Sequence, residues 1–366
     1  MNIHKIMIEE KNSKSSLITI DIARAIAALG VFYYHQRVGD LLFKHTGIVQ
    51  FKATDAFGAF YAVPLFFLIS GYCIHLSNLK YVKNKQALPI KEYYKRRLLR
   101  IYPPYLVAVV FSILVNFFTH TSTPISWADL LVHIFLLQGF TVSYFNSINI
   151  VLWTITIELA FYIIYPLFYY LCVRFSLLHA ICFSFIVSCI SIAIISTLRN
   201  LPLPLFYFVL NLWFAWCCGA YLADKKTLNK TDLSQPGYKI FYAIIVAMFA
   251  WKFTGHWFSP IVGYQVNILI WTGPLLFLLN KESFFAKKQW LLLKVIAALG
   301  LSSYSLYLFH EPLIFLKNLL VHKYLPQQLQ LAGLIGGFFF IPVITWLSYL
   351  YVERPFISKK RKRVTE

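Results

Sequence analysis

Charged residues are scarce in this chain of 366 residues. Asp and Glu together number only 14, and all charged types make up 13% of the residues. Hydrophobic residues reach 59%, and the mean hydropathy is +0.65. These values exclude an ordinary soluble domain, whose composition is far less apolar. The composition instead predicts a polytopic membrane protein.

The patterns of metal and nucleic-acid binding are also missing. Six cysteines lie in or at the ends of apolar runs, with no C-x2-C pair and no histidine at metal spacing. We interpret them as small packing residues and expect no metal. The net charge of +20 comes from bases in short loops rather than from a basic helix face or domain, so we expect no nucleic-acid partner.

Ten apolar runs are long enough to cross the membrane, since a helix needs about 20 residues to span roughly 30 Å of hydrocarbon. The sequence therefore predicts an all-α fold with about ten transmembrane helices. Their approximate bounds are 17–37, 57–78, 101–119, 151–173, 177–198, 203–223, 238–254, 261–279, 295–320 and 331–352.

Lys and Arg are distributed unevenly between the loops. If residues 1–16 are cytoplasmic, the inside segments hold 26 of the 34 bases and the outside segments hold 6, while Arg24 and Lys317 lie within spans. The positive-inside rule then predicts that both termini are cytoplasmic. No internal repeat is visible, and we expect one membrane domain over residues 17–356, followed by a basic tail at 357–366.

Residues 120–150 contain an apolar stretch, Trp127–Phe140, that is too short to span. An extra crossing there would invert every later loop and place the basic tail outside. We therefore expect one short re-entrant or interfacial segment on the outer side, where protein must cover its backbone. The first span carries Arg24 and lacks a small-residue cleavage site, so it is expected to remain as a signal anchor.

The first span carries an R-x10-H pattern formed by Arg24 and His35. Eleven steps of about 100° return within about 20° of the starting direction, so both side chains lie on one helix face, roughly 16 Å apart along the axis. Ionisable groups in membrane spans are rare and usually functional. This pattern suits a protein that holds a charged ligand at one depth and performs proton chemistry at another.

Further motifs follow in a fixed order along the chain. They are Pro64-Leu-Phe-Phe-Leu-Ile-Ser-Gly-Tyr72, Tyr94-Lys-Arg-Arg-Leu-Leu-Arg-Ile-Tyr-Pro-Pro-Tyr105, Leu152-Trp-Thr-Ile-Thr-Ile-Glu158 with Phe161-Tyr-Ile-Ile-Tyr-Pro166, Gly300-Leu-Ser-Ser-Tyr-Ser-Leu-Tyr-Leu-Phe-His310-Glu-Pro312, and Val352-Glu-Arg-Pro-Phe356. Together with the R-x10-H pattern, these motifs resemble acyltransferase family 3, a family of integral-membrane O-acyltransferases, over residues 17–356.

The resemblance implies transfer of an acyl group, most often acetyl, from cytoplasmic acetyl-CoA to a hydroxyl of a cell-surface or exported carbohydrate or lipid-linked glycan. It also implies a multi-pass protein of the bacterial cytoplasmic membrane, with membrane lipid around it, and here a stand-alone form without a hydrolase-like domain. The chain departs from the family at Trp153–Glu158, where Trp-Ser-Leu-x-Val-Glu is usual. It also has Glu311 where an aromatic residue often follows the histidine.

Three residues are the candidates for catalysis. His35 is expected to act as general base on the acceptor hydroxyl, because imidazole titrates near the required pH, with a buried histidine that only bonds a neighbouring helix as the alternative. The guanidinium of Arg24 is suited to hold phosphate or pantetheine oxygens or to polarise the thioester, although pairing with Asp21 would equally explain it. Glu158 either orients His35, binds the sugar, or pairs with another buried cation.

Two further groups are candidates for substrate binding. Arg97 and Arg100 lie on one helix face and are predicted to hold the phosphates of coenzyme A, with membrane-side anchoring as the alternative. His310, Glu311 and Tyr304 are candidates for the acceptor side, and Pro312 is expected to kink their span. Glu353 is interpreted as a helix-end anchor rather than a catalyst.

Two other classes of function fit part of the pattern. A transporter or flippase for an anionic glycan or lipid-linked saccharide would also need intramembrane Arg, His and Glu, but such proteins often have internal repeats. A sensor that binds acyl-CoA or lipid at a basic inner face would have no need for His35 in line with Arg24. Consumption of acetyl-CoA by the purified protein would separate the enzyme from both. The acceptor and the oligomeric state stay open.

Overall fold

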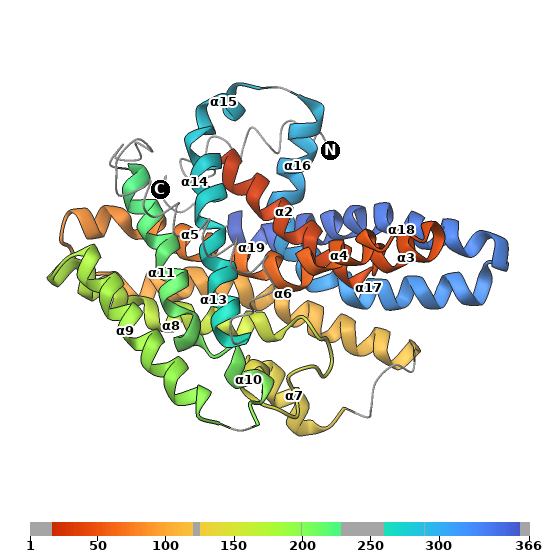
Figure 1. Cartoon of the computed structure of the whole chain (residues 1–366), viewed down its shortest axis with the longest axis horizontal. Helices are drawn as coiled ribbons and strands as arrows, with labels where there is room; N and C mark the ends of the chain where they lie inside the picture. Colours follow the sequence, from red (N-terminus) through yellow and green to blue (C-terminus); the bar gives the residue numbers. More distant parts are fainter. Residues whose placement is uncertain (1–16, 120–124, 199, 228–259, 289, 359–366) are drawn as a thin grey trace. The chain divides into compact units, whose positions relative to one another are not determined.

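The computed structural model describes residues 17–119, 125–198, 200–227, 260–288 and 290–358 (Figure 1). This part of the chain is helical and contains no strand. Its elements are α2 (Ile18–His35), α3 (Val38–Thr46), α4 (Gln50–Phe57), the π-helix η1 (Gly58–Ala62), α5 (Val63–Lys83), α6 (Ile90–Thr119), α7 (Trp127–Ile134), the 3-10 helix η2 (Gln138–Phe140), α8 (Trp153–Arg174), α9 (Leu177–Ser196), α10 (Leu203–Phe206), α11 (Val209–Thr227), α13 (Pro260–Ile270), α14 (Thr272–Asn280), α15 (Glu282–Lys287), α16 (Leu291–Leu301), α17 (Ser303–Tyr324), α18 (Gln327–Ser348), the π-helix η3 (Tyr349–Glu353) and α19 (Arg354–Ser358).

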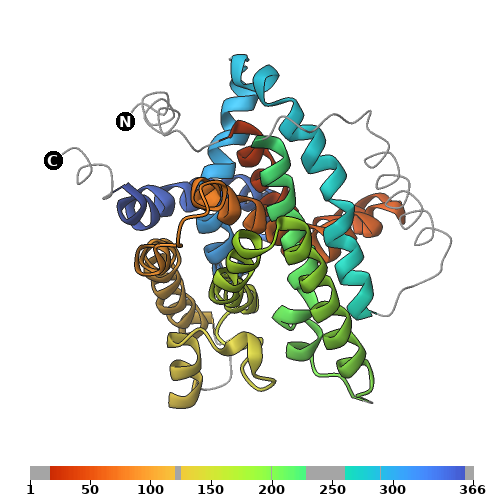
Figure 2. The ribbon, with the colours of Figure 1, turned by 90° about the vertical axis from the view of Figure 1, so that its left-hand side faces the viewer.

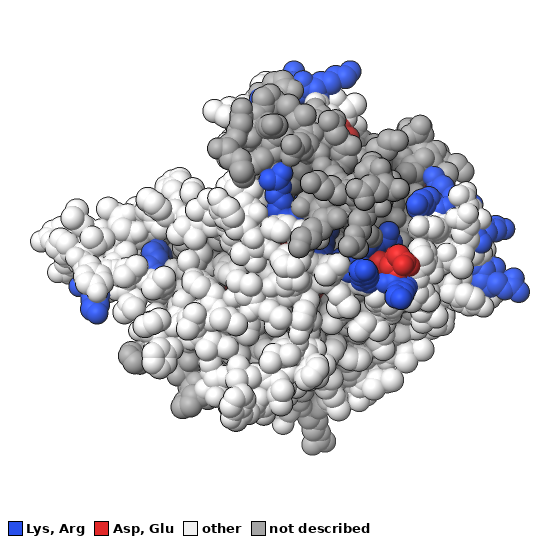
Figure 3. Space-filling view, turned by 180° about the vertical axis from the view of Figure 1, so that it is seen from behind, with Lys and Arg blue, Asp and Glu red and all other residues white. Residues whose placement is uncertain are grey.

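Seven helical stretches of the described residues are long and apolar enough to cross a membrane, or eight if α16 and α17 count as one span. Large apolar side chains such as Phe117 and Phe339 are exposed along these helices, as expected for surfaces that face lipid. The described surface seen in Figure 3 is mostly free of charged side chains. The prediction of an all-α polytopic membrane protein is confirmed.

Eight of the ten predicted spans fall on these stretches and on the α16–α17 pair, but several bounds differ. α6 begins at Ile90 rather than at residue 101, so the basic residues before the apolar run are helical. The span expected at 261–279 is divided at Trp271 into α13 and α14. The prediction measured apolar length alone, whereas a helix continues through polar residues that keep its hydrogen bonds. The span expected at 238–254 lies outside the described residues.

α2 is unbroken from Ile18 to His35, which is the condition that the R-x10-H pattern requires. It is not among the seven apolar stretches, because Asp21, Arg24 and His35 lower its hydropathy. The carboxylate of Glu282 satisfies the first N–H groups of this helix, accepting from the nitrogen atoms of Ile18 at 3.1 Å and Thr19 at 3.0 Å. Orphan N–H groups at a buried helix start need such a partner.

The described residues form two compact units. The first holds the chain up to Ala27, Ala59–Leu88 and Ile163–Leu301. The second holds Ala28–Gly58, Pro89–Tyr162 and the chain from Ser302 onward. α2 and α8 each contribute residues to both units.

Close helix packing organises the first unit. α5 approaches α11 at Gly71 and Gly219, where an added Cβ would lie 2.0 Å from the carbonyl oxygen of Trp216 and 2.1 Å from that of Leu68. α9 runs beside α11 in Figures 1 and 2, and Ser188 of α9 donates to the carbonyl oxygen of Leu210 at 2.7 Å. Small residues that allow close approach are typical of helix pairs in membranes.

The second unit is built around α17, which packs against α18 and α6 (Figure 1). α17 continues through Pro312, and the interruption of the predicted ninth span lies at Ser302 instead. His310 and Glu311 therefore lie on a helix. α7 is a helix of 8 residues, too short to cross a bilayer, so residues 127–140 form no span, as the sequence predicts.

Candidate active site

The structure brings His35, at the end of α2, against His310 of α17. The Nδ1 atom of His35 lies 2.6 Å from Nε2 of His310. The two rings are stacked, with centroids 4.9 Å apart and an interplanar angle of 12°. Both residues were candidates from the sequence, His35 as the base and His310 for the acceptor side. Their contact joins positions that lie 275 residues apart in the chain.

The surroundings of His310 define which nitrogen atoms carry protons. Its Nδ1 lies 3.0 Å from the carbonyl oxygen of Leu306 and 2.8 Å from that of Tyr307. Carbonyl oxygens only accept, so Nδ1 carries a proton, and Nε2 of the neutral ring accepts. Nδ1 of His35 must then donate to it, which leaves Nε2 of a neutral His35 unprotonated. That atom has the lone pair that a general base needs.

Aromatic packing holds the pair in this orientation. The ring of Phe32 on α2 lies edge-on to His310, with centroids 6.3 Å apart, and stacks on Phe338 of α18 at 5.2 Å. The ring of Tyr307, one turn before His310, has its centroid 5.9 Å from that of the His310 ring. His310 is 1% exposed, so its ring is fixed by neighbours on every side rather than by solvent.

The Trp153–Glu158 motif supports α17 through its threonine residues. The Thr154 hydroxyl donates to the Tyr307 hydroxyl at 2.9 Å, and the Tyr307 hydroxyl donates to the carbonyl oxygen of Val151 at 3.1 Å. Thr156 accepts from the backbone N–H of Gly139 at 3.1 Å. The motif thus joins α8 both to the turn before His310 and to the segment that follows α7.

Glu158 is not the partner of His35. Its carboxylate accepts from the Tyr162 hydroxyl, one turn later on α8, at 2.5 Å. The Tyr162 ring in turn faces the guanidinium of Arg97, 5.7 Å from the ring centroid. Of the alternatives for Glu158, the structure places it in a cluster with a tyrosine and a nearby cation, while His310 takes the position beside His35.

Arg97 is buried, whereas Arg100 is half-buried. The guanidinium of Arg97 lies between the rings of Tyr93 and Tyr162, at 5.8 and 5.7 Å from their centroids. The Tyr93 hydroxyl donates to the carbonyl oxygen of Tyr162 at 3.1 Å, which joins α6 to α8. Arginine is suited to this stacked position because its planar ion is weakly hydrated.

Arg24 lies in the first unit, where its guanidinium contacts Asp21 and Cys73. Its Nη1 lies 3.3 Å from Oδ1 of Asp21, so the pairing foreseen from the sequence is present. Its Nη2 lies 3.3 Å from the Sγ of Cys73 on α5. Close packing of Gly300, whose added Cβ would lie 1.9 Å from the carbonyl oxygen of Asp21, positions this turn of α2.

The two remaining acceptor-side candidates differ. The Tyr304 hydroxyl donates to the carbonyl oxygen of Ile101 at 2.9 Å and so links α17 to α6. Glu311 is half-buried and has no hydrogen bond or ion pair with any other described residue. Glu353, taken from the sequence as a helix-end anchor, is buried and accepts from Ser305 at 2.7 Å.

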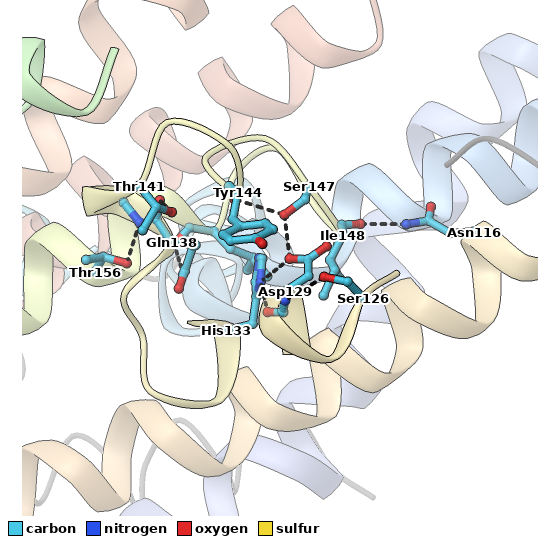
Figure 4. A network of polar contacts seen from close by, with 12 residues as sticks. Asn116, Ser126, Asp129, His133, Gln138, Thr141, Tyr144, Ser147, Ile148 and Thr156 are labelled. Carbon is cyan, nitrogen blue, oxygen red and sulfur yellow. Dashed lines mark hydrogen bonds and ion pairs between the residues drawn. The ribbon is translucent and has the colours of Figure 1, made fainter. Parts of the chain in front are cut away.

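A polar network in the segment after α7 was not singled out from the sequence (Figure 4). Asp129 of α7 lies between His133, 3.0 Å from its Nδ1, and Ser147, whose hydroxyl donates to it at 2.7 Å. Ile148 has a φ of +47°, which is rare for a β-branched residue, and its carbonyl oxygen accepts from Asn116 of α6 at 2.7 Å. The signal in the sequence that could have revealed this network is the presence of polar residues within the apolar stretch Trp127–Phe140.

Asn149 connects this network to the histidine pair. It is 1% exposed, and its Nδ2 lies 3.1 Å from Ser112 Oγ of α6 and 3.2 Å from the carbonyl oxygen of Leu308 on α17. Irregular backbone at membrane depth is tolerated only where protein satisfies it. Here Asn116 and Gln138 satisfy the carbonyl oxygens of Ile148 and Leu152, and Asn149 braces the turn before His310.

Within the described residues, no group of three His, Cys, Asp or Glu side chains is placed to hold a metal ion.

Comparison with known proteins identifies the family. A family model described as an acyltransferase domain matches residues 17–353. This chain belongs to acyltransferase family 3. The match covers the R-x10-H pattern and extends to Glu353, so it includes both histidines of the site.

Relatives of this family member carry informative names. The O-acetyltransferase OatA of Staphylococcus aureus (strain NCTC 8325 / PS 47) is 27% identical over 382 residues, covering 96% of this chain and 59% of that protein. The peptidoglycan O-acetyltransferase OatA of Listeria monocytogenes serovar 1/2a is 28% identical over 167 residues, covering 43% of this chain and 24% of that protein. The chain thus spans less than two thirds of either relative. No solved structure matches it significantly.

Proposed function

We propose that this protein is a membrane O-acetyltransferase that moves an acetyl group from acetyl-CoA to a hydroxyl of a cell-surface or exported carbohydrate. The family supports acyl transfer, and the names of the relatives favour acetyl as the group and a carbohydrate as the acceptor. The observation that carries the catalytic assignment is the His35–His310 contact, because it leaves Nε2 of His35 free to accept a proton.

The proposed reaction is a direct transfer of the acetyl group from acetyl-CoA to the acceptor hydroxyl. The acceptor hydroxyl gives its proton to Nε2 of His35 as its oxygen attacks the thioester carbonyl carbon. The carbon–sulfur bond then breaks, and the leaving thiolate takes the proton from the His35 imidazolium. The products are the O-acetyl ester and free coenzyme A. His310 stabilises the imidazolium by accepting from its Nδ1–H, as an orienting group does in related acid–base pairs.

The donor side is assigned to arginines. Arg24 is proposed to hold acetyl-CoA, and its contact with Asp21 fixes the guanidinium for that task. Arg97 and Arg100 are proposed to act at the coenzyme A phosphates. Because Arg97 is buried between two tyrosines, Arg100 is the better exposed of the two, and we propose that it makes the first contact.

We further propose that the protein lies in the bacterial cytoplasmic membrane with both termini inside. This topology follows from the asymmetry of Lys and Arg along the chain. It places acetyl-CoA and the basic loops on one side and the His35 end of α2 toward the other, so an outside acceptor would reach Nε2.

The function can be tested with purified protein in liposomes. Isotope-labelled acetyl-CoA is added on one side and peptide-free peptidoglycan strands or a uronic-acid oligosaccharide on the other. We expect release of coenzyme A and labelled ester on the carbohydrate, both detected by mass spectrometry. Movement of glycan across the bilayer with no consumption of acetyl-CoA would instead support the transporter.

A further inference from the structure

Lys317 of α17 is a basic residue within an apolar span that the proposed chemistry does not use. It follows His310 by seven residues, and seven steps of about 100° return within about 20° of the starting direction. Lys317 therefore lies on the same face of α17 as His310, roughly 10 Å further along the helix. An ionisable group at this depth is costly and marks a functional position by default.

The path of the Lys317 side chain is set by a glycine. Its stem packs over Gly337 of α18, where an added Cβ would lie 2.1 Å from Cδ and 2.9 Å from Cγ of the lysine. Its Nζ donates to Oε1 of Gln36 at 2.5 Å. Lysines in membrane spans normally extend the ammonium group toward water. Here the ammonium is held instead beside the residue that directly follows His35.

The side chains of Lys317 and Gln36 keep hydrogen-bond donors that no described residue accepts from. The Nε2 of Gln36 is buried and has no acceptor in the part of the chain that the structure describes. The Lys317 ammonium has three N–H donors, and among the described residues it bonds only Gln36 and forms no ion pair. A charged donor and a neutral donor thus lie together beside the end of α2, and no carboxylate of a described residue pairs with the ammonium.

We propose that Lys317 and Gln36 form a subsite for an anionic group, a carboxylate or a phosphate, on the acceptor. The ammonium supplies the charge and the Gln36 amide a directed hydrogen bond. The hydroxyl to be acetylated then lies at Nε2 of His35, close along the same face. This inference rests on the proposed function and deepens it, because it makes the acceptor an acidic glycan.

The first test needs no variant. Wild-type protein in liposomes receives peptide-free peptidoglycan strands with free carboxylates, the same strands with the carboxylates converted to amides, and strands with a phosphate in their place. We expect kcat/KM to be about tenfold higher for an anionic acceptor than for the amide, equivalent to one charge-assisted contact. The two anionic forms reveal whether the subsite prefers carboxylate or phosphate. Equal rates on charged and amide strands would overturn the subsite.

Variants then assign the preference to Lys317. Lys317→Met should lower kcat/KM for the anionic strands about tenfold more than for the amide strands, and Lys317→Arg should keep most of the preference. Gly337→Ala should act like Lys317→Met because its Cβ collides with the lysine stem. Gly336→Ala is the matched control, since no atom lies within 4 Å of its added Cβ.

The outcomes separate this inference from the proposed function. A wild-type protein that acetylates no strand contradicts the function itself. A wild-type preference for anionic strands that survives both Lys317→Met and Gly337→Ala contradicts the subsite. An equal loss on charged and amide strands in these variants would assign Lys317 a purely structural role and also overturn the proposal.

Discussion

The two ends of α2 use polar groups in opposite ways. Near its start, Arg24 is neutralised by Asp21 and contacts the thiol of Cys73. At its end, His35 faces another neutral base, His310, and no carboxylate of a described residue bonds either ring. A compensated cation can hold a ligand without changing its protonation, whereas a histidine pair can take up and release a proton. In the proposed mechanism, one helix thus separates ligand binding from proton transfer.

Removal of His35 should have the largest effect. His35→Ala is expected to lower acetyl transfer by about 10²–10⁴-fold, the usual contribution of general acid–base catalysis. Expression and membrane insertion should stay normal. His322→Ala on α17 is the control, because His322 is exposed and, among the described residues, bonds only Gln330. Wild-type rates from a well-inserted His35→Ala protein would remove His35 from the mechanism.

Replacement of His310 tests whether this residue sets the tautomer of His35. His310→Phe keeps a ring but removes the acceptor for Nδ1–H of His35, and transfer should fall about tenfold or more, the value of one lost buried hydrogen bond. His310→Gln retains an acceptor and should recover part of the rate. Steady-state kcat of both variants is the measurement. Equal activity of the two would show that His310 does not set the tautomer.

The placement of Arg24 and His35 on one continuous helix could be predicted from sequence, because helix periodicity is a local property. α2 indeed continues unbroken through both residues. The partnership of His35 with His310 could not, since it depends on the packing of Phe32 against Phe338 and of α17 against α18. From the sequence, Glu158 was a candidate to orient His35, alongside sugar binding and pairing with another buried cation. Helix packing gave that position to a second histidine instead.

The segment after α7 illustrates the same limit. Its short length and apolar character predicted that it does not cross the membrane, and α7 has only 8 residues. Its role in bracing α17 through Asn149 depends on contacts with Ser112 and Leu308, which no periodicity reveals. Hydrophobic length is readable from sequence, whereas the pairing of buried polar groups requires the fold.

At the other end of α2, loss of Arg24 should impair donor binding more than acceptor binding. Arg24→Gln is expected to raise the KM for acetyl-CoA about tenfold, the value of a charge-assisted hydrogen bond, with little change in the KM for the carbohydrate. Asp21→Asn should have a smaller effect in the same direction, because it releases the guanidinium but keeps its charge. Arg174→Gln, at the exposed end of α8, is the control. A change confined to the acceptor KM would reverse the assignment of the two ends.

The smallest expected effect concerns the support of the histidine pair. Asn149→Ala removes a buried side chain that bonds both α6 and α17, so the free energy of unfolding should fall by about 1–3 kcal/mol. The measurement is the thermal midpoint of the purified protein. Asn146→Ala, in the same segment but exposed, should leave the midpoint unchanged. Equal midpoints for the two variants would mean that Asn149 does not brace α17.

The most direct test of His35 as the base compares two acceptors that differ only in the acidity of the reacting hydroxyl, for wild-type and His35→Ala protein. A more acidic hydroxyl needs less help to lose its proton. The deficit of His35→Ala in single-turnover transfer from acetyl-CoA should therefore be clearly smaller for the more acidic acceptor. An equal deficit for both acceptors would contradict the account and make His35 a residue of binding or packing rather than the base.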